Sequence, residues 1–422
     1  MTYRNRLIDG QLNEFFPELA AISLEGPKGV GKTATAMQRA QTILRLDDPS
    51  TADLLSANPD IIRSSPSPVL IDEWQEVPSS WDMVRREVDR DGTGGRFLLT
   101  GSAVPSGARI HSGAGRIVSL RMRPLSLAER SLETPTVSLA TMFTGESEIA
   151  GVSSLTVQDY FVEIVASGFP GIRHLSSASR ALQLDSYIER VITKEFVEQG
   201  LAVRRPAILR AWLAAFAAST ATTASYNTML EATTPRGEAK PSRITTSNYR
   251  DVLERLWLID SLPAWIPSKN TFTRLAAAPK HFLADPALAA RILGIDETSF
   301  VKRLPTGEIV PGAPALVGGL FEALAVLSIK TYAQVSQSSV SHFREPSGTR
   351  EIDMIVHRPD GAAVAFEVKL GRVVDDRDVR HLLWLKKKLG EDLRDMAVVY
   401  TGEYAYRRPD GVAVVPASLL GP

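Results

Sequence analysis

One glycine-rich stretch near the N-terminus constrains the fold more than any other. An apolar run at 20–24 precedes it and is typical of a buried strand, and apolar spacing predicts a helix over 33–44. Residues 42–47 are either the end of this helix or a second strand. Glycines let successive N–H groups turn toward one anion, and the helix start adds partial positive charge. The stretch fits G-x-x-x-x-G-K-[ST] and comprises Gly26, Pro27, Lys28, Gly29, Val30, Gly31, Lys32 and Thr33. It predicts a phosphate-binding loop for a nucleoside triphosphate, in preference to a strand–helix turn without a ligand.

Two side chains of this loop have expected roles in nucleotide chemistry. Lys32 is expected to reach the β- and γ-phosphates, and the hydroxyl of Thr33 is expected to bind Mg²⁺. The residues 69–73 form a second motif, an apolar run that ends in Asp72 and Glu73. A buried parallel strand delivers such acids to its C-terminal edge, where ligands collect in α/β sheets. Asp72 is expected to hold Mg²⁺ through water, and Glu73 to act as general base on the attacking water.

A third buried strand is predicted over 96–102, and it ends in hydroxyl side chains. In the strand order of AAA-type ATPases it lies beside the phosphate loop. Thr100 or Ser102 then touches the γ-phosphate or the water, or else caps the strand end.

Arg116 precedes a further predicted strand at 117–122. Its place is similar to that at which AAA-type ATPases carry the arginine that reaches into a neighbouring subunit, which makes Arg116 the candidate for this role. A guanidinium there can neutralise charge that grows on the transferred phosphoryl group. Arg109 and Arg121 are rivals for this role, and a solvated surface arginine is the alternative for all three.

The middle of the chain predicts helices over 181–199, 206–219, 225–231 and 246–262, with Thr246 or Ser247 as cap of the last, and a strand over 258–266. Helices followed by a small β-ribbon are typical of a winged helix, which often binds DNA. The basic residues nearest to such a surface are Lys240, Arg243, Arg250 and Arg255. A module that mediates protein contacts is the alternative.

The C-terminal part predicts a hairpin that gathers charged groups. Strands are expected over 350–356 and 362–370, and a three-residue loop with Gly361 at positive φ pairs Arg358 with Ala362. The same register pairs Asp353 with Glu367, and the period of two places Lys369 on their face. A helix that begins at 318 and carries Glu322 precedes the hairpin, and a charged helix over 376–395 follows.

This constellation is what a magnesium-dependent phosphodiesterase needs. Asp353 and Glu367 are expected to hold the metal, and Lys369 to orient or deprotonate water. Asp…Glu-x-Lys on a hairpin, after a helix that carries Glu322, resembles the PD-(D/E)xK restriction-endonuclease fold. The alternatives are a binding module that keeps the residues, or a cross-strand salt bridge of little energetic weight.

Three segments resemble a widespread prokaryotic family that joins an AAA-type ATPase domain to a C-terminal domain of unknown function. They are VLIDEWQEVP at 69–78, FLLTGSA at 97–103 and MRPLSL at 122–127. The resemblance implies ATP rather than GTP, and it places Lys32, Thr33, Asp72, Glu73 and Thr100 at the nucleotide positions. The chain departs from the family pattern at Gly171, where an acid is usual, and at Lys194-Glu195, where Arg-Asp is common.

Composition excludes several classes of protein. Lys and Arg number 48, as do Asp and Glu, so global charge does not indicate a polyanion partner. The absence of cysteine excludes disulfides, thiol catalysis and zinc–thiolate sites. Neither a signal core nor an apolar run of ~18 residues is recognised, which predicts a soluble cytoplasmic protein without a membrane partner.

We therefore expect an α/β chain with an AAA-type P-loop ATPase domain at 1–130, a linker at 131–155, a helical or winged-helix domain at 156–300 and a restriction-endonuclease-like α/β domain at 301–422. The leading hypothesis is an ATP-hydrolysing, homo-oligomeric ATPase that uses ATP and Mg²⁺ and moves or processes DNA. The alternatives are an ATP-controlled, magnesium-dependent DNA nuclease and a nucleotide-dependent switch that binds a protein partner.

Overall fold

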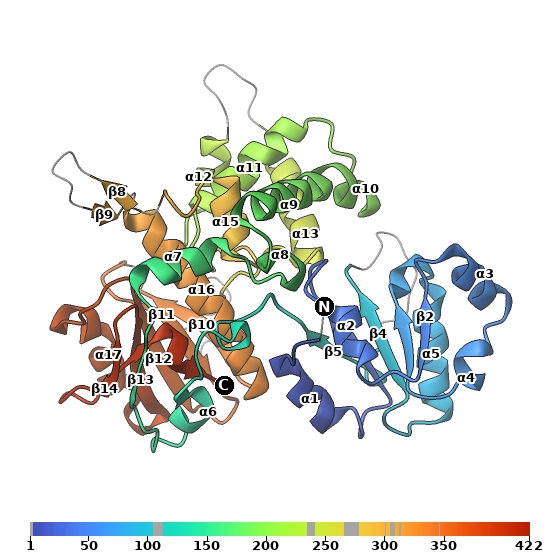
Figure 1. Ribbon diagram of the computed structural model, residues 1–422, viewed down its shortest axis with the longest axis horizontal. Helices are drawn as coiled ribbons and strands as arrows, with labels where there is room; N and C mark the ends of the chain where they lie inside the picture. Colours follow the sequence, from blue (N-terminus) through green and yellow to red (C-terminus); the bar gives the residue numbers. More distant parts are fainter. Residues whose placement is uncertain are drawn as a thin grey trace.

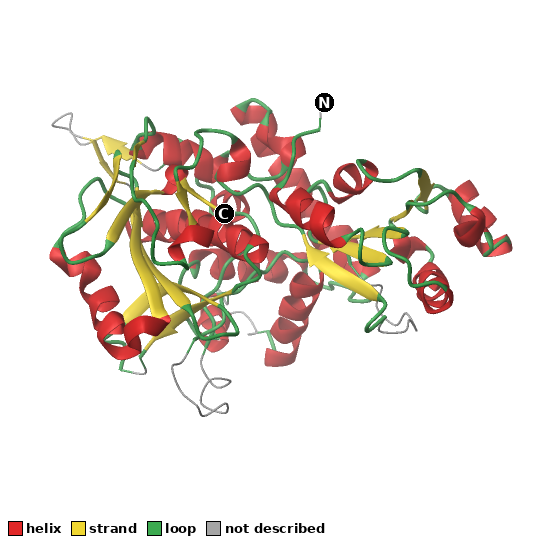
Figure 2. Ribbon diagram, turned by 90° about the horizontal axis from the view of Figure 1, so that it is seen from below, coloured by secondary structure: helices red, strands yellow, loops and turns green. Residues whose placement is uncertain are grey.

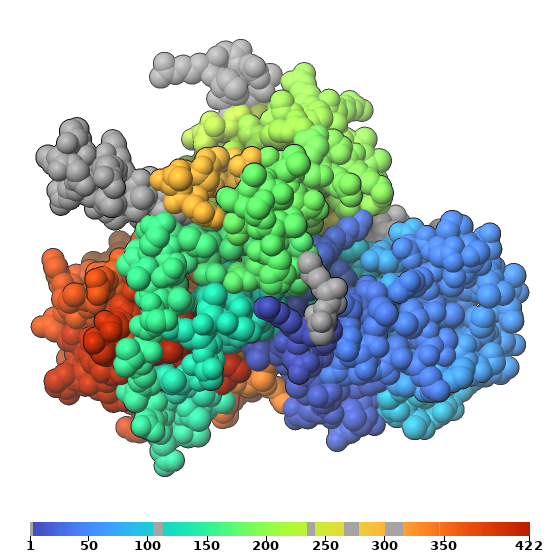
Figure 3. Space-filling model, viewed as in Figure 1, coloured from blue at the N-terminus to red at the C-terminus, as the bar shows by residue number. Residues whose placement is uncertain are grey.

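The computed structural model describes residues 3–103, 113–233, 241–265, 278–299, 301–303, 309–311, 314–345 and 347–422. An N-terminal body lies at one side of the molecule, a C-terminal body at the other, and a helical module lies above and between them (Figure 1). The strands gather in two groups at opposite ends, with helices between them (Figure 2). The space-filling view shows the helical module in contact with both bodies (Figure 3).

The N-terminal body contains a parallel sheet whose five strands lie in the order β2-β3-β4-β1-β5. Its strands are β1 (Ala21–Glu25), β2 (Thr42–Arg45), β3 (Val69–Asp72), β4 (Phe97–Gly101) and β5 (Ile117–Arg121). Around them lie α1 (Leu7–Phe15), α2 (Lys32–Met37), α3 (Pro49–Ala57), α4 (Ile61–Ser64), α5 (Ser79–Arg90) and the 3₁₀ helices η1 (Trp74–Glu76) and η2 (Ala128–Arg130). β4 pairs in parallel with β1, the strand before the phosphate loop, as expected.

The unbroken apolar runs of these strands follow from burial on both faces. Leu70 and Leu98 belong to one hydrophobic core, whereas Ile71 and Leu99 belong to another on the opposite face. The predicted helix over 33–44 ends at Met37, and of the two alternatives for 42–47 the second strand is confirmed, because Thr42–Arg45 pairs in parallel with Val69–Asp72. Sheet pairing there overrides the local helical period.

The helical module spans the middle of the chain, and its core gathers Phe196, Trp212, Phe216 and Tyr249. Its helices are α7 (Val157–Val165), α8 (Pro170–Arg173), α9 (Ser177–Arg190), the π-helix η3 (Val191–Glu195), α10 (Phe196–Glu198), α11 (Pro206–Ala218), α12 (Tyr226–Ala232), α13 (Arg243–Arg255) and α15 (Pro286–Ile292). The predicted cap of α13 at Thr246 or Ser247 is wrong. Ser242 caps the helix by accepting a bond from the Thr245 N–H, so the helix starts earlier.

A short ribbon follows α13, where the sequence predicted a strand. Residues 258–262 run antiparallel to 280–284, with bridges at Ile259–Leu283 and Leu262–Lys280. The ribbon continues onto the C-terminal sheet, because the His342 N–H donates to the Pro263 carbonyl at 2.9 Å. The ribbon is therefore packed against the C-terminal body.

The C-terminal body is built on a mixed sheet with the order β10-β11-β12-β13-β15-β14-β7. Its elements are α16 (Pro314–Val335), β10 (Ser339–Arg344), β11 (Glu351–His357), β12 (Ala363–Lys369), α17 (Asp376–Leu389), η4 (Gly390–Asp392), β13 (Leu393–Tyr400), β14 (Tyr404–Arg407), β15 (Ala413–Pro416), η5 (Ala417–Leu419) and β16 (Leu420–Gly421). An antiparallel pair of short strands, β8 (Val301–Arg303) and β9 (Ile309–Pro311), precedes α16. The helix predicted over 376–395 ends at Leu389, since Gly390 at φ 57° terminates it and Asp395 lies in β13.

The residues predicted as a linker, 131–155, are part of this body. They form β6 (Val137–Ser138), α6 (Leu139–Met142) and β7 (Gly151–Val152). β6 pairs with β16, and β7 pairs with the edge strand β14. Two-residue strands of this kind lack a period that a sequence can reveal, which is why the segment resembled a loop.

Helix α16 is the exception to the expected absence of long apolar stretches. Among the described residues it is the one helix long and apolar enough to cross a membrane, over Ala315–Val335, and 61% of the apolar window is buried inside the protein. It carries Glu322 and Lys330, both of which form ion pairs. A mostly buried core helix can have the same length and apolar composition.

Burial of His342 predicts an acid-sensitive contribution to stability. The residue is 1% exposed, and burial lowers the pKa of its imidazole from 6.5 to about 4. Between these values the unfolded chain binds the proton and the folded chain does not, so stability falls as pH falls. We expect wild type to lose roughly 2 kcal/mol more than His342→Gln between about pH 7.5 and about pH 5. Urea unfolding of both proteins measures this, and equal losses would contradict it.

Candidate nucleotide-binding site

The glycine-rich loop lies between β1 and α2 and is pressed against the start of the MRPLSL segment. Gly26 has φ 151°, and a Cβ at this position would lie 2.2 Å from the Met122 carbonyl oxygen. Gly31 has φ 101° and forms the N-cap of α2 in the left-handed conformation. Glycine at these two positions is thus required by close approach and by backbone conformation.

Lys32 is buried inside the loop, with 5% of the residue exposed. Its ammonium donates to the Gly26 carbonyl at 2.8 Å and to the Pro27 carbonyl at 3.1 Å. Burial lowers the pKa of Lys32 to about 8. The cation therefore sits at the centre of the loop, where phosphate oxygens can replace the two carbonyl acceptors.

Asp72 connects the loop to the end of β3. Its Oδ1 accepts from the Thr33 hydroxyl at 2.7 Å and also from the Thr100 hydroxyl. Thr100 stands directly opposite Asp72 in the β3–β4 ladder, which fixes this contact. A hydroxyl and a carboxylate at hydrogen-bond distance, next to a phosphate loop, are oxygen donors that fit Mg²⁺.

Glu73 follows at the strand end in the left-handed conformation, at φ 53°. A non-glycine residue in this region is uncommon and gathers at functional sites. Its carboxylate accepts from the Gln75 side chain, and Oε2 lies 3.5 Å from the Ser102 hydroxyl. Thr100 thus bonds to Asp72 and Ser102 approaches Glu73, so the two hydroxyls predicted as rivals have separate partners.

A cavity of about 370 Å³ lies between the loop and the helical module. Lys28, Gly29 and Ser102 line it from the N-terminal body, and the helical module contributes Tyr187, Arg190, Val191, Lys194 and Glu195. The π-helix η3 supplies part of this wall, and π-helical turns are frequent at functional sites.

Direct contacts cross this cavity. The Lys28 ammonium pairs with Glu195 at 2.7 Å, and the Tyr187 hydroxyl donates to the Lys28 carbonyl at 3.3 Å. The pairing was not predicted, although Lys194-Glu195 had been noted as a departure from the family pattern.

The candidate arginines lie in different surroundings. Arg116 pairs with Asp89 at 2.8 Å, and its side chain is 45% exposed. Arg121 instead pairs with Asp260 at 3.1 Å and is mostly buried, which leaves it unsuited to reach another subunit. Arg109 lies outside the described residues.

Asp260 holds three cations at the junction of the three parts of the molecule. Arg121 and Arg123 come from the N-terminal body, Lys330 comes from α16, and Asp260 itself lies on the ribbon. Burial raises the pKa of Asp260, but the cations, Arg123 first, outweigh it and hold the pKa well below its usual value.

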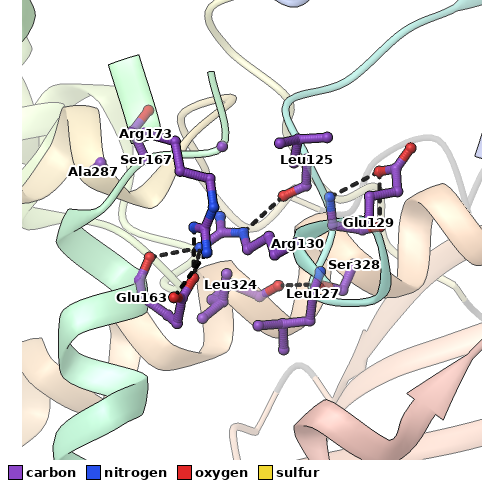
Figure 4. Close-up of polar contacts among 12 residues, drawn as sticks. Leu125, Leu127, Glu129, Arg130, Glu163, Ser167, Arg173, Ala287, Leu324 and Ser328 are labelled. Atoms are coloured by element: carbon purple, nitrogen blue, oxygen red, sulfur yellow. Dashed lines mark hydrogen bonds and ion pairs between the residues drawn. The ribbon is translucent and has the colours of Figure 1, made fainter. Parts of the chain in front are cut away.

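A second buried network surrounds Arg130, just after the MRPLSL segment (Figure 4). Its guanidinium donates to the Leu125 carbonyl at 3.0 Å and to the Glu163 carboxylate at 2.8 Å. Arg173 donates to the same carboxylate at 2.7 Å, and the Leu127 N–H donates to the Ser328 hydroxyl at 3.1 Å. The segment after β5 is thereby tied to α7 and α16.

The predicted hairpin of the C-terminal body has the expected register. Met354 pairs with Phe366, Gly361 has φ 93°, and the Arg358 N–H donates to the Ala362 carbonyl at 2.9 Å. The same register continued places Asp353 opposite Glu367. Lys369, however, forms its ion pair with Asp378 of α17.

A different lysine occupies the carboxylate cluster. Lys280 of the ribbon places its ammonium 2.9 Å from Asp353, 2.9 Å from Glu322 and 2.8 Å from Glu351. Burial lowers the pKa of Lys280, but the carboxylates, Asp353 first, outweigh it and raise the pKa well above its usual value. Burial raises the pKa of Glu322 to about 8 and that of Glu367 well above its usual value. Within the described residues, no group of three or more His, Cys, Asp or Glu is arranged to hold a metal ion.

Comparison with known families supports a class for the N-terminal body. Residues 19–131 match the model of an AAA domain. The match supports an AAA-type ATPase family. Residues 157–299 match a domain of unknown function, DUF8612, and residues 317–420 match another, DUF4143. The AAA match covers the phosphate loop, Asp72, Glu73 and Thr100; ATP and Mg²⁺ are the usual ligands of such domains.

Relatives and solved structures add little about function. An uncharacterized protein of Mycobacterium tuberculosis and one of Mycobacterium bovis are each 25% identical over 413 residues, which is 94% of this chain and 80% of the relative. A structure of Drosophila ORC bound to DNA overlaps 68% of this chain and 94% of that chain, at 12% identity and a TM-score of 0.24. An overlap of that quality supports no argument about function.

Proposed function

We propose that this protein is an AAA-type ATPase that binds ATP with Mg²⁺ at the glycine-rich loop and hydrolyses it. The observation that carries the proposal is the contact of Thr33 with Asp72 at 2.7 Å, beside the buried ammonium of Lys32. This contact brings the phosphate loop and the acidic strand end to one point. The elements α2, β2, α3 and α4 separate the loop from β3 in the sequence, so only the fold creates the site.

Each residue has a defined task in this proposal. Lys32 exchanges its carbonyl partners for phosphate oxygens, while Thr33 and Asp72 would hold Mg²⁺, which neutralises phosphate charge when bound. Glu73 accepts the proton of the attacking water. Ser102, 3.5 Å from Glu73, orients the water or the γ-phosphate.

Steady-state hydrolysis of ATP by the purified full chain tests the proposal. We expect Mg²⁺-dependent release of phosphate by wild type and loss of this activity in Lys32→Ala. Equal release by both proteins, or none by wild type, would refute hydrolysis at this loop.

We propose further that the helical module responds to the nucleotide through Lys28. Glu195 holds the Lys28 ammonium at 2.7 Å, and both residues line the cavity beside the loop. A bound triphosphate brings negative charge toward the same ammonium and competes with Glu195. Release of Glu195 then changes the contact between the loop and η3. Through this change the protein acts as a nucleotide-dependent switch.

Replacement of Glu195 with glutamine is expected to tighten ATP binding by about two- to fivefold, since it removes an anion that competes for the Lys28 ammonium, and the 43% exposure of the Lys28 side chain keeps the effect small. The dissociation constant of a fluorescent ATP analogue measures the change. Glu189→Gln is the matched control, because Glu189 lies on the preceding helix and pairs with Arg210 at the surface. Equal affinities of all three proteins would contradict the competition.

We also propose DNA as the partner of the ATPase, and the basis is the order of the elements in the helical module. The helices α11, α12 and α13 and the ribbon succeed one another as in a winged helix. Of the basic residues expected at this surface, Arg250 pairs with Asp251 and Glu254 on its own helix, and Lys240 lies outside the described residues. Stimulation of hydrolysis by single-stranded, duplex or branched DNA would support a DNA motor. Unchanged turnover with all three would favour the switch that binds a protein partner.

We also propose a homo-oligomer in which the exposed Arg116 reaches the nucleotide of a neighbouring subunit. Each variant alone is expected to lack activity. In mixtures of Arg116→Ala with Lys32→Ala we expect activity to return, because a Lys32→Ala subunit can supply Arg116 to the intact loop of an Arg116→Ala neighbour. Mixtures without recovery would argue against that role.

A further inference from the structure

The carboxylate cluster of the C-terminal body contains a cation that belongs to the chain itself. Lys280 is 1% exposed, and its ammonium lies within 2.9 Å of oxygens from Glu322, Glu351 and Asp353. These carboxylates come from α16 and β11, whereas Lys280 comes from the ribbon that follows the helical module.

The Lys280 ammonium occupies the point between these three carboxylates. An ammonium has three N–H donors, and that of Lys280 donates to Glu322 and Asp353 at 2.9 Å each while the Glu351 carboxylate lies 2.8 Å away. The remaining oxygen of Asp353 accepts from the Val368 N–H at 2.9 Å. A metal ligated by Asp353 would have to displace Lys280, and the residues as arranged therefore do not fit the metal that the sequence predicted for Asp353 and Glu367.

We propose that Lys280 is the resident cation of this cluster, where it excludes divalent metal ions and clasps the ribbon onto the C-terminal body. The clasp has a backbone component. The His342 N–H of β10 donates to the Pro263 carbonyl at 2.9 Å, the Trp265 N–H donates to the His342 carbonyl at 2.6 Å, and the Ala278 carbonyl lies 3.0 Å from the His342 ring. These contacts hold the ribbon that carries Lys280 against β10, beside the carboxylates.

In this arrangement the carboxylate cluster has a different role from the one it would have in a metal-dependent nuclease. While the ribbon is docked, Asp353, Glu322 and Glu351 compensate the charge of Lys280. The acids that a nuclease would use to bind a metal instead join the helical module to the C-terminal body, and the latent metal site opens only when Lys280 leaves.

Cleavage directed by Fe²⁺ and ascorbate tests metal access in the full chain without nucleotide, with fragments mapped by mass spectrometry. We expect wild type to show no cleavage at 351–353 or 367–369. Lys280→Ala is expected to show cleavage there at least tenfold above the wild-type level, because the carboxylates are left without a cation. The control Lys387→Ala removes an exposed lysine of α17 and is expected to match wild type.

Two results would overturn the proposal. One is cleavage at 351–353 in folded wild type, because metal would then enter with Lys280 in place. The other is a folded Lys280→Ala protein without cleavage there. If Lys280→Ala does not fold, as shown by its circular dichroism, Asp353→Asn with Lys280 retained replaces it. Wild type must then match Asp353→Asn in showing no metal-directed cleavage, and an excess over that variant contradicts exclusion.

Discussion

Replacement of Glu73 with glutamine is expected to lower kcat for ATP hydrolysis by at least about a hundredfold, the range of a lost general base. Glutamine keeps the size of the side chain and its hydrogen bonds but cannot accept the proton of the attacking water. ATP binding is expected to persist, since Lys32, Thr33 and Asp72 are untouched. Phosphate release and equilibrium binding of ATP, measured on the same protein, separate the two effects.

Glu76→Gln is the matched control, because Glu76 is exposed and lies in the 3₁₀ helix just after Glu73. It is expected to hydrolyse ATP at the wild-type rate. If Glu73→Gln retains full activity, the general base lies elsewhere. If both variants lose activity equally, the loss comes from the structure of the strand end rather than from proton transfer.

Replacement of Asp260 with asparagine is expected to destabilise the fold by at least about 3–5 kcal/mol, the cost of breaking a buried ion pair. Asp260 compensates Arg121, Arg123 and Lys330, and the amide would leave these buried cations without a counter-charge. The free energy of unfolding in urea, or the thermal midpoint if unfolding is irreversible, measures the loss.

The control for this prediction is Asp185→Asn. Asp185 pairs with Arg291 at 2.5 Å, but the two side chains are 49% and 32% exposed. Exposed pairs contribute roughly 0–1 kcal/mol, so this variant is expected to remain close to wild type. Similar losses in both variants would show that burial of the Asp260 network does not have the energetic weight assigned to it.

Local patterns predicted the parts of the molecule that local forces determine. The glycine pattern and the apolar run before Asp72 predicted two sides of the proposed nucleotide site, because each pattern consists of consecutive residues. The register of the β11–β12 hairpin followed from one turn with Gly361 at positive φ. The unbroken apolar runs also predicted that these segments are strands buried on both faces.

Contacts between distant segments had no such signal. Lys280 meets Asp353 and Lys28 meets Glu195 across long stretches of chain, and lone charged residues have no period that predicts a partner. Lys369 was expected in the cluster because strand alternation gives the face of a side chain but not its partner, and Asp378 of the next helix binds it instead. The Asp260 network likewise depends on how three parts of the chain pack together.

The central claim is that the helical module responds to the nucleotide through the contact of Lys28 with Glu195. Hydrogen–deuterium exchange of the Glu73→Gln protein, with and without ATP and Mg²⁺, tests it most directly. We expect ATP to change the exchange of backbone amides in α9 and η3, residues 183–195, in addition to protecting the phosphate loop. Protection of the loop with unchanged exchange over 183–195 would contradict the claim.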